Sequence, residues 1–311
     1  MKTLYKYFVF SDVHGEYDAL QKGLEEAGYD RYNQTHRLVC LGDGFDRGPH
    51  SRKIWNLMYS VPNSIYIKGN HDVMFQEYLE KGMDGEYVLF NILHNGLGET
   101  IKSFTGLQDN QFSIDTLQKA RSNMGNRREI LAWLQNRPLY YETENFIFVH
   151  AGINPHIADW KDTDEHYMLW DIEDSHRPCS NTSKIVIIGH HHAFRVRKNA
   201  KRDGYPETTF KNCVIKSRLK DENGKNRLIK MESFGNTDEH KPCFVGNKIA
   251  IDGCTNLTKK VNILVFEDYE KDEEKEKQQG QTIYMDPNNL YSYSYGYDTA
   301  TTTTAYTAFR G

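Results

Sequence analysis

The stretch "RLVCLGDGFDRGPHS", residues 37–51, joins a short apolar run to a compact polar bend. Residues 37–41 are rich in aliphatic side chains and are closed by Gly42, a pattern that predicts a buried strand. Asp43 therefore lies at the carboxyl end of that strand, where open α/β sheets bind ligands because rigid strands hold exposed loops. Taken alone, the bend also fits a turn or a helix cap ahead of residues 51–59.

Four more apolar segments of the chain end in polar residues of the same few types. Two of them are residues 7–10 and 64–68, and the other two precede His150 and His190. In chain order these segments deliver Asp12, His14, Asn70, His71, His150, His190, His191 and His192. Residues two apart on an extended segment point the same way, so Asp12 and His14 are expected to converge. Five apolar segments that each end in Asp, Asn or His favour one shared functional site at the sheet edge over five independent turns.

The residue types at these five strand ends narrow the chemistry. Carboxylate, amide and imidazole groups without any cysteine suit manganese, iron(II) or zinc, and disfavour a thiolate structural zinc site. The set is too large for a single ion that keeps a position open for substrate. Two ions about 3.5–4 Å apart, bridged by one carboxylate, use the same ligands and leave room for water and a phosphoryl oxygen. The sequence therefore predicts two divalent metal ions, with Mn²⁺ as the first choice and Fe²⁺ or Zn²⁺ as alternatives.

The series of motifs Asp-x-His-Gly, Gly-Asp-x-x-Asp-Arg-Gly, Gly-Asn-His-Asp, His-Ala-Gly and Gly-His resembles the calcineurin-like metallophosphoesterases. The full "GDGFDRG" is similar to the serine/threonine phosphoprotein phosphatase branch, and the compact chain is most similar to its bacterial and phage members. The resemblance spans about residues 5–266 and includes "NKIAIDGCTN" and "VNILVFED" near its end. It implies an α/β fold with two facing mixed β-sheets, a β-sandwich, flanked by helices.

The resemblance also implies a set of metal ligands. Metal one is expected on Asp12, His14 and Asp43, and metal two on Asp43, Asn70, His150 and His190. In the wider metallophosphoesterases the second histidine of a Gly-His-x-His ending binds metal one, and "GHHH" gives that place to His192. His191 would alternate away from its neighbours in an extended segment, so it is expected to be a solvated histidine.

Catalytic roles follow for the residues beside these ligands. Arg47 offers a planar fork that matches two phosphate oxygens. His71 is expected to protonate the leaving alkoxide, and Asp46 to hold and polarise its imidazole, with a helix cap as the alternative for Asp46. Asn70 and Lys68 are further expected substrate contacts. Lys68 stands where the phosphatase branch usually has arginine, so it keeps the charge but loses the bidentate fork.

A second departure from the family pattern lies in "YMLWDIED". The family supplies a further phosphate-binding arginine directly after Trp-Asp or Trp-Ser, but here Ile172 follows Asp171. Arg177 and Arg195 are the two candidates for its replacement, and the sequence leaves both open.

The length and composition of the chain limit the class of protein to which it can belong. The chain has 311 residues, 38% of them hydrophobic, which suffices for one large core with an elaboration. No stretch approaches the ~18 apolar residues of a membrane span, and the first twelve residues are expected to form a strand rather than a signal peptide. Five scattered cysteines, an odd number, favour reduced thiols in the cytoplasm. The formal charge of -4 is too small to favour nucleic acid as a partner.

The chain divides into a catalytic domain and a tail. Residues 1–268 are expected to form the catalytic domain. Within it, residues 84–136 are mostly helix-like and carry an apolar stripe of Phe90, Leu93, Leu97, Ile101 and Phe104. Residues 269–280 are expected to be a charged linker, and residues 281–311 a disordered tail rich in tyrosine and threonine. Strand addition to a partner is the alternative for that tail.

A basic insertion is expected at about residues 195–245. Residues 195–230 carry twelve Lys and Arg against four Asp and Glu. Two readings stay open, an ordinary solvated hairpin or a rim that draws polyanionic substrate toward the metals.

The reaction implied is hydrolysis of a phosphomonoester by in-line attack of a metal-bridging hydroxide. The first candidate substrate is a phosphorylated protein, at serine, threonine or tyrosine, or a small phosphoester. The second is a dinucleoside polyphosphate or a nucleotide end. The third, from another class, is an inactive module that binds phosphate or nucleic acid, against which the intact ligand set argues. The native metal, the physiological substrate and the oligomeric state stay open.

Overall fold

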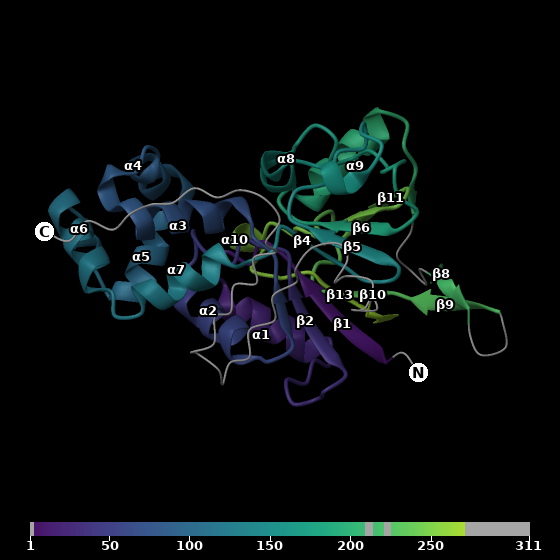
Figure 1. Ribbon diagram of the computed structural model, residues 1–311, viewed down its shortest axis with the longest axis horizontal. Helices are drawn as coiled ribbons and strands as arrows, with labels where there is room; N and C mark the ends of the chain where they lie inside the picture. Colours follow the sequence, from purple (N-terminus) through teal and green to yellow (C-terminus); the bar gives the residue numbers. More distant parts are fainter. Residues whose placement is uncertain (1–2, 209–213, 221–224, 271–311) are drawn as a thin grey trace, which may run out of the picture.

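Two β-sheets form the centre of the molecule. The computed structural model describes residues 3–208, 214–220 and 225–270 (Figure 1). One sheet has five strands in the order β10 (Glu232–Phe234), β13 (Ile263–Tyr269), β1 (Leu4–Phe10), β2 (His36–Cys40) and β3 (Ser64–Tyr66). The other has six, in the order β4 (Tyr140–Glu142), β5 (Phe146–Val149), β6 (Ile185–Ile188), β12 (Lys248–Ala250), β11 (Cys243–Val245) and β7 (Glu207–Thr208). Both sheets are mixed, which agrees with the expected α/β fold of two facing sheets.

Parallel pairing aligns the strands that carry the polar ends. In the first sheet β1, β2 and β3 run parallel, and in the second β5, β6 and β12 do so. Strand β13 pairs antiparallel with β1 on one side and with the edge strand β10 on the other. The carboxyl ends of parallel strands meet at one edge of a sheet, so each sheet gathers its polar loops at a single edge.

Three apolar layers hold the sheets and helices together. Alternation along β1 turns Tyr7 and Val9 toward the second sheet, where they join Phe148 and Ile187 in one buried cluster. Phe8 and Phe10 point the other way and pack with the helices of the first sheet. A third cluster joins the outer face of the second sheet to the helix at residues 193–202. The result is a sandwich of two sheets with helices on both outer faces.

Helices cover the two outer faces unequally (Figure 1). Between β1 and β4 the chain forms α1 (Tyr17–Glu26), α2 (Ser51–Ser60), α3 (Asn70–Lys81), η1 (Gly82–Asp84), α4 (Val88–Phe90), η2 (Asn91–Asn95), α5 (Leu97–Thr105), η3 (Asp109–Gln111), α6 (Ile114–Asn123) and α7 (Arg127–Gln135). Of these, α1 and α2 lie beside the first sheet (Figure 1). The elements η4 (Trp160–Asp162), α8 (Glu165–Trp170), α9 (Ala193–Arg202) and α10 (Thr255–Thr258) follow later in the chain. Elements from α3 to α7 form a helical lobe at one end of the molecule (Figure 1).

The expected apolar stripe in residues 84–136 is wrong in its first half. Phe90 and Leu93 are 56% and 67% exposed, whereas Leu97, Ile101 and Phe104 are buried. The physical reason is a change of helical period, because the short α4 passes into the π-helical η2 before α5 begins at Leu97. A stripe drawn at a constant 3.6-residue period cannot follow that change.

The expected insertion at residues 195–245 also differs from the structure. Its first part is helix α9, whose Val196 and Ala200 are buried against the second sheet. Its last part is β11, a strand inside that sheet. Between them, β8 (Val214–Lys220) and β9 (Asn226–Lys230) form a separate two-stranded hairpin that projects from the body (Figure 1). The linker beyond residue 270 and the tail lie outside the described residues.

Neither disulfides nor a spanning helix marks the described part of the chain. Cys40, Cys179, Cys243 and Cys254 are buried free thiols. Among the residues that the structure describes, no helix has the length and apolar character to cross a bilayer.

Candidate metal centre and active site

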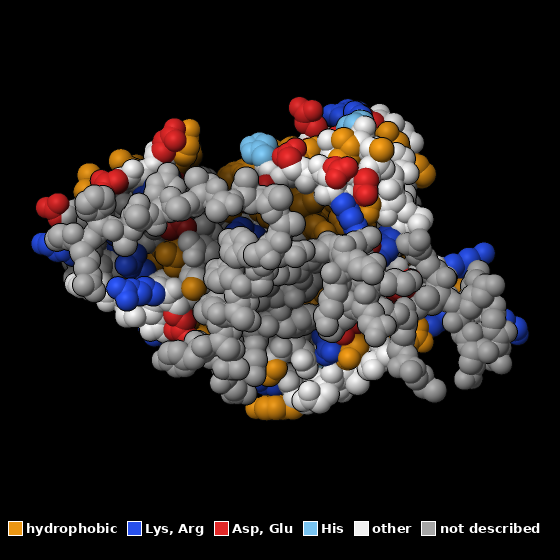
Figure 2. Space-filling view, in the orientation of Figure 1, with side chains coloured by type: hydrophobic (Ala, Val, Ile, Leu, Met, Phe, Trp, Pro, Cys, Tyr) orange, Lys and Arg blue, Asp and Glu red, His pale blue; other side chains and the backbone are white. Residues whose placement is uncertain are grey.

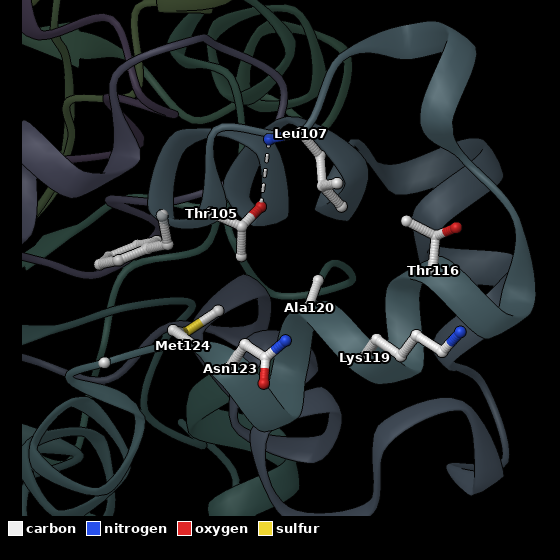
Figure 3. Close-up of a pocket in the computed structure, with 9 residues that line it drawn as sticks. Thr105, Leu107, Thr116, Lys119, Ala120, Asn123 and Met124 are labelled. Carbon is white, nitrogen blue, oxygen red and sulfur yellow. Dashed lines mark hydrogen bonds between the residues drawn. The ribbon is translucent and has the colours of Figure 1, made fainter.

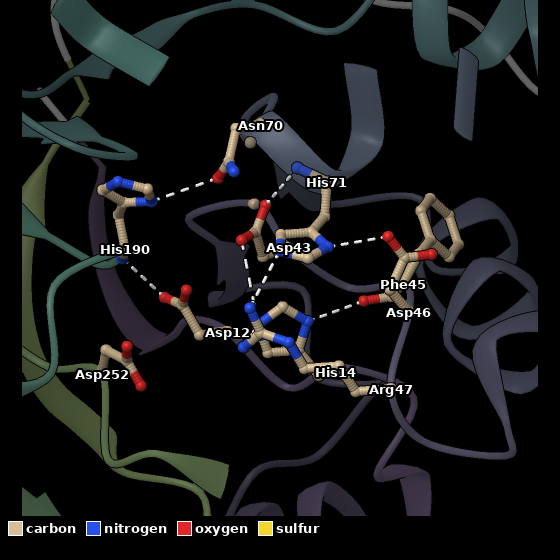
Figure 4. Close-up of polar contacts among 12 residues, drawn as sticks. Asp12, His14, Asp43, Phe45, Asp46, Arg47, Asn70, His71, His190 and Asp252 are labelled. Atoms are coloured by element: carbon tan, nitrogen blue, oxygen red, sulfur yellow. Dashed lines mark hydrogen bonds and ion pairs between the residues drawn. The ribbon is translucent and has the colours of Figure 1, made fainter. Parts of the chain in front are cut away.

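The loops after β1, β2, β3, β5 and β6 converge at the edge where the two sheets meet (Figure 4). Backbone hydrogen bonds tie the first two loops together, because Asp12 N–H donates to Gly42 O at 3.2 Å and His14 N–H donates to Asp43 O at 3.0 Å. His150 reaches the same point from the second sheet and donates from Nδ1 to Leu41 O at 2.7 Å. The structure thus brings together the polar ends of five strands that are far apart in sequence.

An unusual backbone conformation marks this region. In the described part of the chain, eight non-glycine residues have positive φ, and six of them belong to the predicted site: Asp12, His14, Asp43, Asp46, Arg47 and His190. Such left-handed residues cost about 1–3 kcal/mol each and persist where the surroundings enforce them. Asp12 and His14 have φ angles of 50° and 44°, so the segment is left-handed here, and the extended conformation expected from the sequence is wrong.

Asp43 lies between two groups of metal-donor atoms. Its Oδ2 is 3.8 Å from His14 Nε2, and its Oδ1 is 3.5 Å from His150 Nε2. One three-donor group is His14, Asp43 and His71, and the other is Asp43, His150 and His190. Burial would raise the pKa of Asp43, but His150, His71 and His190 outweigh it and lower the pKa. A shared carboxylate between two donor groups has the form of a bridging ligand.

Two histidines are held in the tautomer that metal binding needs. His14 Nδ1 donates to Phe45 O at 2.8 Å, as His150 Nδ1 does to Leu41 O. With Nδ1 bonded in this way, Nε2 of each ring is directed to the site, and carbonyls that fix a ligand histidine are common around metals. Burial, reinforced by Arg47, holds the pKa of His14 well below its usual range.

The amide of Asn70 completes the fit of these residues to a cation. Asn70 Oδ1 lies 2.9 Å from His150 Nε2 and 3.1 Å from His190 Nδ1. Acceptor atoms that face one another at such distances suit a positive ion among them. Oxygen and imidazole donors with no thiolate in either group match the borderline to hard divalent metals expected from the sequence.

Asp12 lies at the edge of this arrangement. Its Oδ2 accepts from the backbone N–H of His190 at 2.8 Å and from the Ser11 hydroxyl. Burial and the neighbouring Asp252 carboxylate raise the pKa of Asp12. Asp12 belongs to neither three-donor group, and its place on metal one stays a prediction that requires its carboxylate to turn toward His14.

The "GHHH" segment is not the extended stretch that the sequence predicted. His192 donates from Nδ1 to an Asp252 carboxylate oxygen at 2.9 Å, and its Nε2 lies 3.7 Å from Cys254 Sγ. It belongs to neither three-donor group, and its place on metal one stays a prediction. His191 is buried at 7% exposure, and the expectation of a solvated histidine is wrong. The reason is a tight turn, closed by a hydrogen bond from His191 N–H to Gly189 O, in place of an extended segment.

The predicted catalytic residues form a chain of contacts (Figure 4). His71 Nδ1 lies 2.7 Å from Asp46 Oδ2, and the Arg47 guanidinium contacts His71 Nε2 at 3.0 Å and His14 Nε2 at 2.8 Å. Burial would lower the pKa of His71, but the carboxylates of Asp43 and Asp46 outweigh it and raise the pKa. Asp46 is fully buried and caps no helix, since α2 begins after His50.

Two residues that position the site, Thr100 and Asp72, were not predicted from the sequence. Thr100 on α5 donates its hydroxyl to Asp46 Oδ1 and accepts the Asp46 N–H, both at 2.7 Å. Asp72 accepts the N–H groups of Gly69 at 2.6 Å and Asp43 at 3.3 Å. The sequence does contain a signal for Asp72, because an acidic residue at the third position of a helix often accepts a hydrogen bond from the backbone at its N-terminus. Thr100 had none, since it lies 54 residues from its partner.

The three candidates for phosphate binding, Lys68, Arg177 and Arg195, lie in different surroundings. Lys68 lies directly before the Gly69 turn, and its backbone N–H donates to Pro138 O at 2.9 Å. Arg177 is paired with Asp174 at 3.4 Å. Arg195 lies in the first turn of α9, with its guanidinium over the Phe194 ring at 5.8 Å. Ile172, which stands in place of the family arginine, is 55% exposed.

A separate hollow of about 320 Å³ lies in the helical lobe (Figure 3). It is lined by residues of α5, α6 and their flanking loops, among them Phe104, Leu107, Lys119 and Met124. None of the predicted site residues lines it, so it is distinct from the metal centre.

Comparison with known proteins agrees with this geometry. A profile of the calcineurin-like phosphoesterases matches residues 5–216, which is well over half of the chain. The chain belongs to the calcineurin-like phosphoesterase family. It is therefore a member of a family of hydrolases that use a pair of divalent metal ions, and the residues of its strand-end loops are suited to such a pair.

Relatives within this family carry two kinds of name. The chain is 27% identical over 165 residues to the asymmetrical bis(5'-nucleosyl)-tetraphosphatase PrpE of Oceanobacillus iheyensis, covering 50% of this chain and 59% of that protein. It is 36% identical over 75 residues to serine/threonine-protein phosphatase 2 of Escherichia coli, covering 24% of this chain and 33% of that protein. A metallophosphoesterase structure from Sphaerobacter thermophilus aligns with a TM-score of 0.41 at 15% identity, over 86% and 89% of the two chains. The chain thus spans less than two thirds of the curated relatives it matches.

Proposed function

We propose that this chain is a metal-dependent phosphohydrolase that acts on nucleoside polyphosphates, with dinucleoside tetraphosphates as the first candidate. The observation that carries the hydrolytic part is the pair of donor groups that share Asp43, one of which includes His71 in contact with Arg47. When two divalent ions are bound there, they supply a water of lowered pKa and positive charge for the phosphoryl oxygens. Mn²⁺ is our first choice, because the donors are carboxylate, amide oxygen and imidazole.

The chain's own residues do the rest of the chemistry. Asp43, Asn70, His150 and His190 would hold the second ion, and His14, Asp43 and Asp12 would hold the first. Arg47 now spans His14 and His71, so substrate binding turns its fork toward two phosphoryl oxygens. That movement frees His71 Nε2 to carry a proton to the leaving oxygen, while Asp46 keeps the ring oriented from Nδ1. Lys68 adds a point charge beside the phosphoryl group.

Similarity to bis(5'-nucleosyl)-tetraphosphatases supports the nucleotide substrate. The sequence alone placed phosphoproteins first, but these relatives align with about half of the chain, whereas the aligned phosphoprotein phosphatase segment covers a quarter of it. A protein serine/threonine phosphatase is the second candidate, because that shorter segment has the higher identity, 36%. Four buried free thiols favour a reducing compartment for either activity.

A substrate panel tests this proposal. Chelator-treated protein, reloaded with Mn²⁺, is assayed with diadenosine tetraphosphate, a phosphoserine peptide and RNA carrying a 5'-triphosphate. We expect kcat/KM for the dinucleotide to exceed that for the peptide by at least about tenfold. A preference for the peptide would move the second candidate to first place, and inactivity on all three would contradict the hydrolase assignment.

A further inference from the structure

An aromatic strip on α8 begins at the candidate ligand His190. Trp170 is the last residue of α8, and its ring meets the His190 ring edge-on, with centroids 6.5 Å apart and an interplanar angle of 82°. His166, four residues earlier on the same helix, stacks beside Trp170 with centroids 6.4 Å apart and planes 22° apart. Residues four apart lie on one face of a helix, so the two rings form a continuous strip that leads away from the metal centre.

Trp170 differs from the other three tryptophans in its surroundings. Trp55, Trp133 and Trp160 are 3%, 4% and 6% exposed and pack inside apolar clusters. Trp170 is only partly buried and belongs to none of these clusters, and its neighbour Ile172 is 55% exposed. An indole that contributes to no core cluster, and that lies one ring from a phosphate-binding centre, is available to a ligand.

Figure 2 shows where this strip stands in the molecule. A hollow lined by hydrophobic side chains separates the helical lobe from the part of the molecule that holds α8 and α9. A planar group attached to a phosphate at His190 can therefore reach the α8 strip without entering the core.

We propose that Trp170, flanked by His166, is a nucleobase-binding subsite that stacks one base of a nucleoside polyphosphate whose phosphate lies at the metal centre. This inference rests on the proposed function, since it assigns the base of the same substrate to a residue of this chain. Every base has a flat aromatic face, so stacking on Trp170 is tolerant of base identity. A phosphoserine or phosphothreonine side chain offers no ring for this strip.

Calorimetry with two probes separates the base from the phosphate. Adenosine 5'-monophosphate and ribose 5-phosphate share the phosphate and the sugar, and only the former has a base. Wild-type protein with Mn²⁺ should bind the nucleotide roughly 5- to 100-fold more tightly, which is the usual worth of one base–aromatic stack. Trp170→Ala should bring the two affinities together, and Trp170→Phe should restore most of the difference. Tyr32→Ala is the matched control, because Tyr32 is an 80% exposed aromatic before the opposite end of β2.

The failures of this inference and of the proposed function are distinguishable. Suppose that wild-type protein prefers diadenosine tetraphosphate in the substrate panel, but Trp170→Ala leaves the ratio of the two probe affinities unchanged. That result would overturn the subsite and leave the proposed function standing. Equal affinities of wild-type protein for the two probes would also overturn the subsite. A preference for the phosphopeptide in the panel would remove the substrate on which the inference rests.

Discussion

His71 and His150 lie within one centre and differ in what their ring nitrogens contact. His71 directs Nδ1 to the Asp46 carboxylate and Nε2 to the Arg47 guanidinium. His150 directs Nδ1 to a backbone carbonyl and Nε2 to Asn70 and Asp43. A carboxylate partner favours the protonated imidazole, whereas a carbonyl partner fixes the neutral ring that binds metal. At the scale of single residues, these partners support the proposal that the first histidine transfers a proton and the second binds metal.

His71→Asn should lower turnover by roughly 10²–10⁴-fold, the usual contribution of a positioned proton donor. The loss should be largest for an alkyl phosphate, whose leaving oxygen needs a proton, and smaller for p-nitrophenyl phosphate, which releases a stable anion. Steady-state kinetics with both substrates measures the ratio of the two losses. His150→Asn is the control, and it should weaken metal binding and reduce both rates alike. Equal losses on the two esters in His71→Asn, with both metals retained, would exclude its role as general acid.

Lys68→Met should raise the KM for phosphoesters by about tenfold, since a charged hydrogen-bonding contact is worth roughly 1.5–3 kcal/mol, less where water screens it. Lys68→Arg should keep or lower KM, because arginine restores the planar fork that the family carries there. The measurement is the substrate dependence of the initial rate at saturating Mn²⁺. An unchanged KM in Lys68→Met would leave Lys68 without a role in phosphate binding.

At the scale of elements, helix α5 positions the catalytic loop. Thr100 lies on α5, and its hydroxyl holds both the N–H and a carboxylate oxygen of Asp46, which is fully buried. Ser51 at the start of α2 contacts the same hydroxyl at 3.0 Å. Helices α5 and α2 thereby fix Asp46, the residue that orients His71.

Thr100→Val keeps the shape of the side chain and removes this hydroxyl, so it leaves a buried carboxylate oxygen and an N–H unpaired. Such groups cost about 1–3 kcal/mol, and we expect a comparable loss of stability together with a fall in kcat of about tenfold or more at little change in KM. Thermal unfolding and steady-state kinetics measure the two effects. Thr100→Ser retains the hydroxyl and should rescue kcat. If Thr100→Val lost stability but kept its kcat, Thr100 would be purely structural.

The turn between β3 and α3 is a second element whose packing the site requires. A Cβ at Gly69 would contact Asp43 Oδ1, with Asp43 N at 2.6 Å and His150 Cε1 at 3.0 Å. Gly69→Ala should therefore displace two ligands, weaken metal binding and destabilise the fold by about 1–3 kcal/mol, the usual cost of overpacking. Gly125→Ala is the control, because nothing lies within 4 Å of its added Cβ. Calorimetric Mn²⁺ titration compares the variants, and wild-type affinity in Gly69→Ala would contradict the close approach.

At the scale of the whole molecule, the metal centre joins the two sheets. Asp43 and Asn70 come from loops of the five-stranded sheet, whereas His150 and His190 come from loops of the six-stranded sheet. The apolar cluster between the sheets holds them together from within. Ions that bind ligands from both sheets add a second link, and their binding free energy contributes to folding.

Saturating Mn²⁺ should raise the melting temperature of chelator-treated protein by several degrees. Ligand at 100 times its Kd adds about 2.7 kcal/mol, and 1 kcal/mol shifts Tm by about 2–4 °C in chains of this size. Asp43→Asn should abolish most of the shift, whereas Asp12→Asn should lose less, because Asp43 faces both donor groups. Differential scanning calorimetry with metal analysis measures both quantities. At most one ion per chain in active protein would contradict the paired centre.

The sequence by itself determined the features that depend on local pattern. Short aliphatic runs before Asp43, Asn70 and His150 identified buried strands, because period and residue type are local properties. The polar residues at the strand ends identified the donor chemistry for the same reason. The family motifs then implied two facing sheets with flanking helices, and the structure confirmed that fold.

Only the tertiary structure decided what depends on contacts between distant segments. The left-handed conformations of Asp12 and His14 are held by hydrogen bonds to the loop after β2. Thr100 reaches Asp46 across 54 residues, and no local pattern records that contact. The turn that buries His191 and directs His192 to Asp252 follows from packing between β6, α9 and the loop after β12. A sequence period describes one segment at a time, whereas these positions are set by the free energy of many segments packed together.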